Sequence, residues 1–150
     1  MKTVYFAQHG ISEPKDINKE RPLSDLGRDD VHKVATYLKN HDIDIGKICH
    51  SGKLRALQTA TMFSDVLNID DISELSGMKP NDHPDELIEQ ITENAVLYVG
   101  HLPNIQNVVS NIINKDSRNP VLKFQNSAVA CIEINNGAGI LKWFITPEMC

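Results

Sequence analysis

Two histidines stand at the ends of two strongly apolar stretches of the chain. His9 follows the uncharged run at residues 3–8, and His101 follows the run at residues 95–100. Uncharged runs rich in β-branched and aromatic residues predict buried strands of a sheet that has helices on both faces. Because ligands of open α/β sheets bind at the carboxyl ends of the strands, both imidazoles are candidates for chemistry. They would meet if the two strands are neighbours.

Arginine is scarce, and two of the four arginines fall on the same rim of the predicted sheet. The four are Arg21, Arg28, Arg55 and Arg118. Arg21 lies in the polar loop after the first strand, and Arg55 lies at the start of a helix that follows the second strand. Guanidinium groups bind phosphoryl oxygens in a two-pronged manner and keep their charge. Singly, each arginine is typical of a surface ion pair; together with the two histidines they favour a phosphate site.

The helices predicted to begin near Lys53 and Pro103 would strengthen such a site. Their N-termini offer free backbone N–H donors and the positive ends of helix dipoles. Among such groups a neutral histidine can act as a nucleophile on phosphorus. The arrangement therefore indicates phosphoryl-transfer chemistry at the carboxyl ends of the strands.

Four short segments, taken in order, carry a resemblance to a known family. They are Gln-His-Gly at 8–10, Arg-Pro-Leu-Ser at 21–24, Ser-Gly-Lys-Leu-Arg-Ala-Leu-Gln-Thr at 51–59 and Gly-His-Leu-Pro at 100–103. The series resembles the histidine phosphatase superfamily, and the short chain and the Arg-Pro-Leu-Ser step look most like its SixA-type phosphohistidine phosphatases. The resemblance runs from Met1 to about Asn114.

The resemblance implies a role for each matching residue. His9 would be the nucleophile and would carry the phosphoryl group until water releases inorganic phosphate. Arg21 and Arg55 would bind the phosphoryl oxygens, and His101 would donate a hydrogen bond to the same group in the transition state, where such donors commonly contribute a few kcal/mol each. No metal and no cofactor is expected, since the arginines do the work of a cation. The expected substrate-binding positions are Gln8, Gly10, Ser51, Asp82 and Glu74.

One position departs from the family pattern, which has Arg-His-Gly where this chain has Gln8, His9 and Gly10. Glutamine keeps an NH2 donor but loses the charge and the two-pronged geometry. Loss of the charge-assisted contact should cost about 1–3 kcal/mol, roughly 5- to 150-fold in rate if only the transition state feels it. The hypothesis is therefore a weakened but active phosphatase.

The sequence shows no strong candidate for an acid that protonates the leaving group. Larger members of the superfamily carry one on an insertion over the site, but the stretch between Leu67 and Val96 is too short for a cap domain. Asp82 and Glu74 are the candidates within it. An imidazole can leave already protonated, so phosphohistidine needs less help from an acid than an alkyl phosphate does. A short, uncapped rim also admits a protein-borne phosphoryl group, and both arguments favour a protein that carries phosphohistidine over a sugar phosphate.

Several other functions fit the same residues less well. The chain would be a phosphate- or phosphoprotein-binding module if the loss of arginine at Gln8 abolished catalysis, or a small-molecule phosphomonoesterase if it accepts small phosphoesters. A metal hydrolase would use histidine ligands, for which the candidates are His9, His50, His83 and His101. These histidines do not have the compact spacing along the chain that metal ligands usually show. The segment 51–53 (Ser-Gly-Lys) is similar to part of a P-loop, but the upstream glycine and the Ser or Thr after the lysine are missing.

The elements that must position these residues follow from hydrophobic periodicity. In chain order we expect strand 3–8, a loop over the sheet edge at 11–23, helix 24–40, strand 44–50, helix 53–67, a short strand near 72, a short helix from 84 that carries Ile91, strand 95–101, a helix from 103, and strands 128–134 and 140–145. Asn-Asn-Gly at 135–137 signals a hairpin. This order predicts an α/β fold, a three-layer α/β/α sandwich with a mostly parallel sheet and an antiparallel C-terminal hairpin. The resemblance implies its phosphoglycerate mutase-like form.

Composition bounds the remaining choices. A chain of 150 residues fits one domain over residues 1–150, and its net charge of −5 gives no global case for binding nucleic acid or an anionic membrane. An anionic ligand therefore needs a local cluster of positive groups. No apolar run approaches the roughly 18 residues of a membrane span, and the N-terminus has no signal-peptide pattern. The three cysteines are Cys49, Cys131 and Cys150. Their odd number and wide spacing are typical of reduced thiols, so we expect a cytoplasmic protein.

Overall fold

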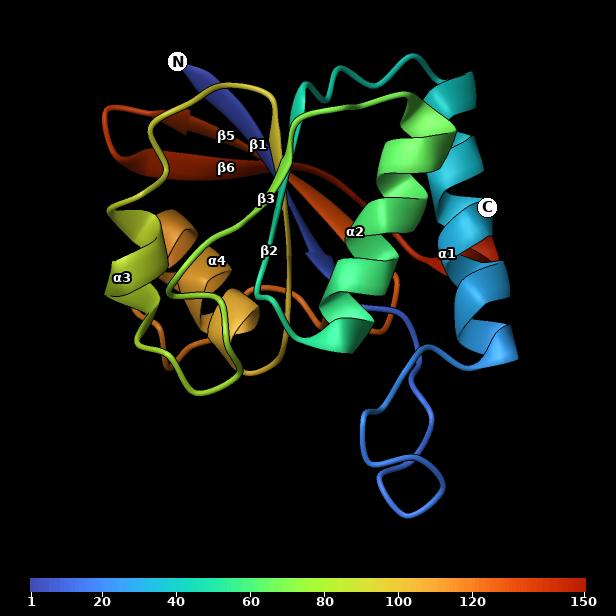
Figure 1. Ribbon diagram of the computed structural model, residues 1–150. Helices are drawn as coiled ribbons and strands as arrows, with labels where there is room; N and C mark the ends of the chain where they lie inside the picture. Colours follow the sequence, from blue (N-terminus) through green and yellow to red (C-terminus); the bar gives the residue numbers. More distant parts are fainter.

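Six strands form one mixed sheet through the middle of the computed structural model, which describes residues 1–150 (Figure 1). The strands are β1 (Lys2–Gln8), β2 (Lys47–His50), β3 (Ile72–Glu74), β4 (Val96–Gly100), β5 (Val129–Asn135) and β6 (Ala138–Ile145). Their order across the sheet is β3-β2-β4-β1-β5-β6. The first four strands are parallel, β5 runs antiparallel to β1, and β6 runs antiparallel to β5. The expected mostly parallel sheet with an antiparallel C-terminal hairpin is therefore confirmed.

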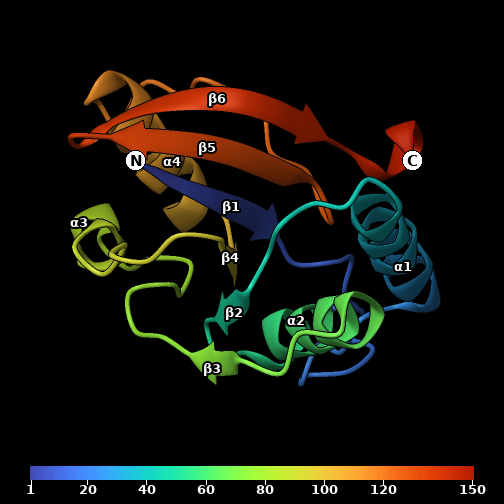
Figure 2. The same ribbon diagram turned by 90° about the horizontal axis from the view of Figure 1, so that it is seen from above.

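Helices cover both faces of this sheet (Figure 2). They are α1 (Asp25–Asn40), α2 (Leu54–Leu67), α3 (Pro84–Ile88) and α4 (Asn104–Asn114), and a 3-10 turn at Pro147–Met149 follows the last strand. The apolar stripes of α1 and α2 pack on one face, and those of α3 and α4 pack on the other. No helix combines the length and the apolar character needed to cross a membrane.

Strand β1 is buried on both sides, as its uncharged sequence predicts. Val4 and Phe6 belong to the core that includes α3 and α4, whereas Tyr5 and Ala7 belong to the core that includes α1 and α2. All four are at most 4% exposed. Because successive side chains of a strand point to opposite faces, a strand between two helical layers must be apolar throughout.

The pairing of β1 with β4 sets the two histidines side by side. The strands are parallel neighbours, and Gln8 is level with Gly100. His9 and His101 each follow directly, so both leave the sheet at its carboxyl end. The backbone N–H of His9 also donates to the carbonyl of Gly100 at 3.0 Å. The condition that the two strands be neighbours is therefore met.

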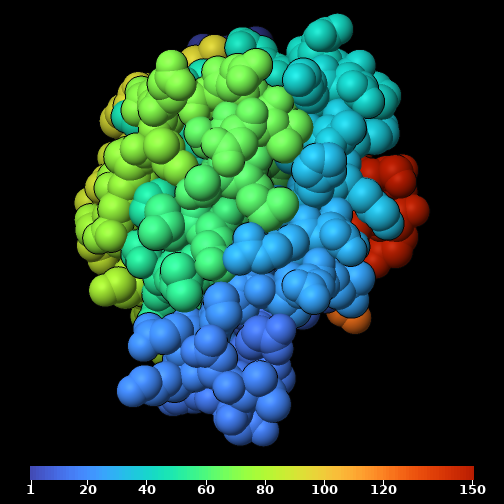
Figure 3. Space-filling view, turned by 45° about the vertical axis from the view of Figure 1, so that its right-hand side comes forward, coloured from blue at the N-terminus to red at the C-terminus, as the bar shows by residue number.

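Two expected boundaries and the course of one loop were wrong. The strand expected at 44–50 begins only at Lys47, which is level with Val96, the first residue of β4. Ala95, the residue before Val96, has a left-handed backbone (φ 60°) rather than the extended one of a strand. Ile91 lies beyond the end of α3. Residues 11–23, expected to form a loop over the sheet edge, project instead beyond the carboxyl ends of the strands (Figure 1) and form a lobe on the surface (Figure 3).

The start of α1 fixes the base of this projecting loop. Ser24 caps the helix, with its Oγ accepting the N–H of Gly27 at 3.0 Å. The Ser24 backbone N–H donates to the carbonyl of Ile11 at 2.9 Å. Gly27 lies against that same carbonyl so closely that a Cβ atom on Gly27 would overlap the Ile11 oxygen. Glycine is therefore required at this helical position by a close approach of backbone.

We expect Gly27→Ala to destabilise the protein by about 1–3 kcal/mol, because the new methyl group overpacks a backbone contact that cannot rotate away. In an unhindered helix the same change stabilises by about 1 kcal/mol. Urea unfolding measures the difference. Gly46→Ala is the matched control, since the atom nearest to its added Cβ would be the Ala95 oxygen at 4.0 Å. A Gly27→Ala protein as stable as the parent would contradict the packing described.

Candidate active site

The imidazole of His9 is held between one acceptor and one donor. Its Nδ1 lies 2.7 Å from the carbonyl oxygen of Gly10, and its Nε2 lies 3.3 Å from Nε of Arg55. A carbonyl oxygen only accepts a hydrogen bond, and a guanidinium N–H only donates one. Nδ1 therefore carries the proton, and Nε2 presents a lone pair toward Arg55.

The backbone around His9 is tied to two other elements. The N–H of Gly10 donates to Oγ1 of Thr59 on α2 at 2.9 Å, and the Thr59 hydroxyl donates to the carbonyl of Arg55 at 2.8 Å. On the other side, Nδ2 of Asn126 donates to the carbonyl of His9 at 3.0 Å. The N–H of Gly10, an expected substrate-binding position, is thus already occupied. What Gly10 supplies here is the carbonyl that orients the His9 ring.

His101 lies against His9, with ring centroids 4.9 Å apart and planes tilted by 53°. It is 1% exposed, and its Nε2 lies 2.6 Å from the hydroxyl oxygen of Ser51 at the end of β2. The backbone N–H of Lys53 also donates to that hydroxyl at 3.3 Å. Nδ1 of His101 is buried without a hydrogen-bond partner. The two imidazoles and Arg55 therefore converge, whereas their parts in catalysis remain predictions.

Burial sets the charge of both rings. Loss of solvent is the largest cause that lowers the pKa of His9 to about 4; the hydrogen bond to Gly10 opposes it, and the charges of Arg55 and Arg21 add to it. Burial likewise lowers the pKa of His101 to about 3, with contributions from His9 and the neighbouring cations. Both imidazoles are therefore neutral at pH 7. A nitrogen nucleophile must be in this state to attack phosphorus.

Arg21 reaches the same rim from the projecting loop. Its backbone is left-handed (φ 51°), and its Nη2 donates to the hydroxyl of Ser12 at 3.0 Å. Its Nε–H is buried and has no partner within the chain. Because buried donors are nearly always paired in native proteins, this guanidinium has capacity to bind an acceptor.

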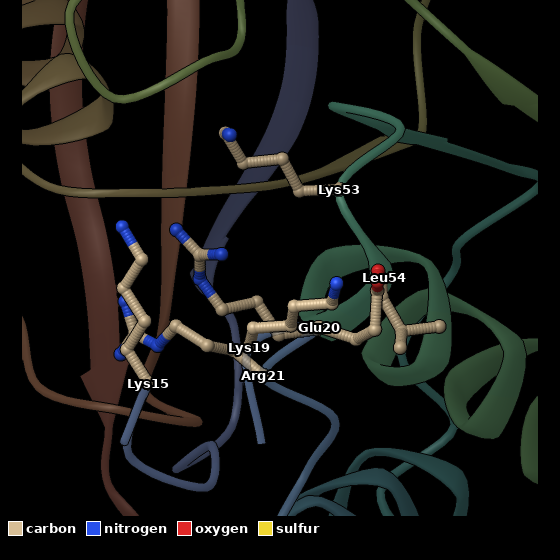
Figure 4. A pocket seen from close by; sticks show the side chains of 7 residues that line it. Lys15, Lys19, Glu20, Arg21, Lys53 and Leu54 are labelled. Carbon is tan, nitrogen blue, oxygen red and sulfur yellow. The ribbon is translucent and has the colours of Figure 1, made fainter. Parts of the chain in front are cut away.

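Positive side chains line a pocket of about 400 Å³ at this rim (Figure 4). Figure 4 shows Lys15, Lys19 and Arg21 extending from the loop. Lys53, the residue before α2, also extends toward the pocket. The full lining is Lys15, Lys19, Glu20, Arg21, Lys53, Leu54 and Arg55. Because the chain as a whole is acidic, an anionic ligand requires a local cluster of positive groups. This pocket provides such a cluster.

The two candidate acids lie in a neighbouring recess rather than in this pocket. Glu74 and Asp82 line a hollow of about 300 Å³ that also contains Ser51. The carboxylate of Asp82 accepts the backbone N–H of Lys79 at 3.0 Å. The carboxylate of Glu74 lies against Gly52, so close that a Cβ on that glycine would overlap it. Ser51 therefore stands between the acidic recess and His101.

The side chain of Gln8 lines neither hollow. Its backbone N–H donates to Ala128 at 3.3 Å, its carbonyl accepts from Ser127 at 3.0 Å, and its side-chain Oε1 is buried without a partner. The expected contact of Gln8 with phosphate stays a prediction.

The histidines of the metal-hydrolase alternative do not gather into one ligand set. Nδ1 of His50 accepts the N–H of Gly52 at 3.1 Å, and Nδ1 of His83 caps α3 by accepting the N–H of Asp85 at 3.2 Å. The chain contains no group of three or more His, Cys, Asp or Glu side chains arranged as metal ligands.

Sequence reasoning gave no individual role to several residues that hold the site. Oε1 of Gln58 accepts the backbone N–H of Leu23 at 2.7 Å and thereby ties α2 to the projecting loop. Gln58 and Thr59 lie within the family-like segment 51–59, which was a usable signal. Asn126, whose amide binds the His9 carbonyl, carries no such signal because it is 117 positions away in the chain.

Comparison with known proteins gives a consistent picture. The family model described as histidine phosphatase superfamily (branch 1) matches residues 4–80, slightly more than half of the chain. The chain is also 27% identical over 153 residues to phosphohistidine phosphatase SixA of Escherichia coli strain K12, a match that covers 96% of this chain and 93% of that protein.

Solved structures share the fold. The protein histidine phosphatase SixA complexed with tungstate matches with a TM-score of 0.83 and 24% identity over 98% of each chain. A mutant phosphoserine phosphatase of Entamoeba histolytica in complex with phosphoserine matches with a TM-score of 0.72 and 14% identity, over 99% of this chain and 98% of that one. The matched family model includes the segments that supply His9, Arg21 and Arg55, and on that match the chain belongs to the histidine phosphatase superfamily, branch 1.

Proposed function

We propose that this chain is a metal-independent phosphohistidine phosphatase that forms a phosphoenzyme on His9. The observation that carries the proposal is the lone pair on Nε2 of His9, directed at Nε of Arg55 from 3.3 Å. A neutral imidazole beside a fixed guanidinium can attack the phosphoryl group that the guanidinium binds. Similarity to a protein named phosphohistidine phosphatase SixA supports the same chemistry.

In the first step, Nε2 of His9 forms a bond to phosphorus while the P–N bond of the substrate breaks. The electron pair of that bond stays on the substrate nitrogen. In the protonated form of phosphohistidine the other ring nitrogen carries a proton, and the imidazole that leaves from this form is neutral. Arg21 and Arg55 bind the phosphoryl oxygens through this transfer.

In the second step, water attacks phosphorus and the P–N bond to His9 breaks. The electron pair returns to Nε2, and both protons of the water leave with the product as dihydrogen phosphate. His101 assists this step through its Nδ1 atom. When the Ser51 hydroxyl donates its proton to Nε2 of His101, Nδ1 of the same ring carries a proton and can donate it in a hydrogen bond to the phosphoryl group.

The distribution of carboxylates favours phosphohistidine as the substrate. The pocket of about 400 Å³ that Arg21 and Arg55 line, here the proposed phosphate pocket, has five cationic side chains and one carboxylate, Glu20, in its wall. An alkyl phosphate requires an acid to protonate its departing oxygen, whereas a protonated imidazole requires none.

A second function, a small-molecule phosphomonoesterase, has one observation in its favour. The carboxylate of Glu74 lies against Gly52 and lines the same recess as Ser51, whose hydroxyl contacts His101. From this place Glu74 would supply a proton to an alkoxide leaving group.

Replacement of His9 tests the main proposal. We expect the parent chain to release phosphate from a phosphohistidine peptide and from an aryl phosphate, and to hold an acid-labile, alkali-stable phosphoryl group after rapid quenching. His9→Ala and the polar variant His9→Asn should lose both activities and the trapped phosphoryl group. His32→Ala, which changes an exposed histidine on α1, is the matched control and should retain both. A phosphoenzyme formed in His9→Asn would show that another residue is the nucleophile.

Glu74→Gln separates the two functions. If Glu74 serves as an acid, its loss should lower turnover of an alkyl phosphate by about 100-fold or more, the range typical of general acid catalysis. Turnover of a phosphohistidine peptide should change less than about twofold, because no acid is needed. Asp82→Asn provides the comparison within the same recess. An equal loss on both substrates would mean that Glu74 holds the site together rather than donating a proton.

The protonation of His9 gives a pH test. Because its pKa is lowered to about 4, the ring stays neutral at pH 6.5, where an ordinary histidine is half protonated. We expect its imidazole nitrogen resonances, assigned with His9→Asn, to titrate near pH 4. Tungstate should raise the midpoint, since an anion beside the ring favours the imidazolium form. A midpoint near 6.5 without ligand would contradict the buried, neutral nucleophile.

A further inference from the structure

We propose that the projecting loop, residues 11–23, together with Lys53, binds an acidic face of the protein that carries the phosphohistidine. The inference rests on the proposed function above and names the kind of surface that surrounds the substrate group. Its evidence is a surplus of positive charge, the shape of the loop and the position of the acidic recess.

The phosphate pocket holds more positive charge than a phosphoryl group needs. A phosphoryl group carries at most two negative charges, which the guanidinium groups of Arg21 and Arg55 balance. Three ammonium groups remain in the same lining against the single carboxylate of Glu20. No residue of this lining takes part in any of the four salt bridges of the chain. The lysines are therefore free to pair with a second anionic group: Lys15, Lys19 and Lys53.

This positive cluster stands out on an acidic protein. The chain has 15 Lys and Arg against 20 Asp and Glu, for a net charge of −5. A local cluster of opposite sign attracts an anionic partner to one place on the surface, and the remaining surface repels it from others. Charge complementarity thus selects both the partner and its orientation.

The loop has the form of a docking element for a protein. It projects from the body of the molecule (Figure 3), and Lys15 and Lys19 on it are exposed. Between them Ile17 is 70% exposed, an apolar side chain that belongs to neither hydrophobic core of the chain. An apolar centre with a charged rim is the usual composition of a protein interface. A small phosphoester would fill the pocket without reaching Ile17.

The loop is held in shape before any partner binds. The N–H of Glu13 donates to the carbonyl of Pro22 at 2.7 Å, and Ser12 pairs with Leu23 in an isolated antiparallel bridge. The N–H of Arg21 donates to the carbonyl of Asn18 at 2.9 Å. Binding therefore does not have to order this segment, which reduces the entropic cost of docking.

The acidic recess on the other side of Ser51 fixes the direction of approach. Its lining includes three carboxylates and one lysine, namely Glu74, Asp82, Glu86 and Lys79. An acidic partner face is repelled there and attracted by the lysines of the pocket lining, Lys15, Lys19 and Lys53. Because the loop itself also carries Glu13, Asp16 and Glu20, the acidic residues of the partner should lie over these lysines, and not over the loop as a whole, when its phosphohistidine enters the pocket.

Three phosphohistidine peptides of equal length test the charge requirement, with glutamate, glutamine or lysine in the positions that flank the phosphohistidine. We expect kcat/KM to fall in that order, with about a tenfold range between the first and the last at low salt. The range should shrink toward twofold or less in about 0.5 M salt, where charges on the surface are screened within a few ångströms.

Paired lysine variants locate the effect. Lys15→Gln with Lys19→Gln should reduce the preference for the glutamate peptide over the lysine peptide to about twofold. Lys33→Gln with Lys39→Gln removes the same charge from exposed positions of α1 and should keep the parent preference. A parent chain that hydrolyses all three peptides equally, or a loop variant that keeps the full preference, would overturn this inference and leave the phosphatase proposal standing. Absence of hydrolysis of every peptide, with no phosphoenzyme on His9, would instead refute the phosphatase proposal.

Discussion

The hydrogen bond between Nδ1 of His9 and the carbonyl of Gly10 determines which nitrogen of the ring carries the proton and which carries the lone pair. It places the proton on Nδ1 and leaves the lone pair of Nε2 facing Arg55. The same glycine is tied through its N–H to Thr59, whose hydroxyl binds the carbonyl of Arg55. A short series of hydrogen bonds therefore orients the proposed nucleophile and the proposed phosphate-binding group together, and it depends on α2 lying beside the segment that follows β1.

Burial and positive charge act on this ring in the same direction. Desolvation lowers the pKa of His9, and the nearby guanidinium groups of Arg55 and Arg21 lower it further by repelling a proton. Those guanidinium groups are also the ones suited to attract a phosphoryl dianion. The charges that keep the imidazole neutral thus also favour binding of the anionic substrate. In the proposed complex, the lysines of the pocket lining extend this attraction for negative charge to the protein surface around the phosphoryl group.

Most of the architecture was predictable because the signals are local. An uncharged run such as β1 fits only a strand covered on both faces, and the spacing of Val31, Val34 and Leu38 produces one apolar stripe on α1. The Asn136-Gly137 turn closes the β5–β6 hairpin with both residues at positive φ. Boundaries were less predictable, since the start of β2 coincides with the start of its partner β4 at Val96, which follows the left-handed residue Ala95 in a distant part of the chain.

For the site, the sequence alone determined the chemical groups: two strand-end histidines and two arginines suited to a phosphoryl group. Only the tertiary structure decided the tautomer of His9, the neutral state of both rings and the placement of Glu74 in a separate recess. The sequence could not show that Asn126 binds the His9 carbonyl. The physical reason is that hydrogen-bond partners and desolvation depend on which segments the sheet order brings together, and residues far apart in the chain carry no local trace of that contact.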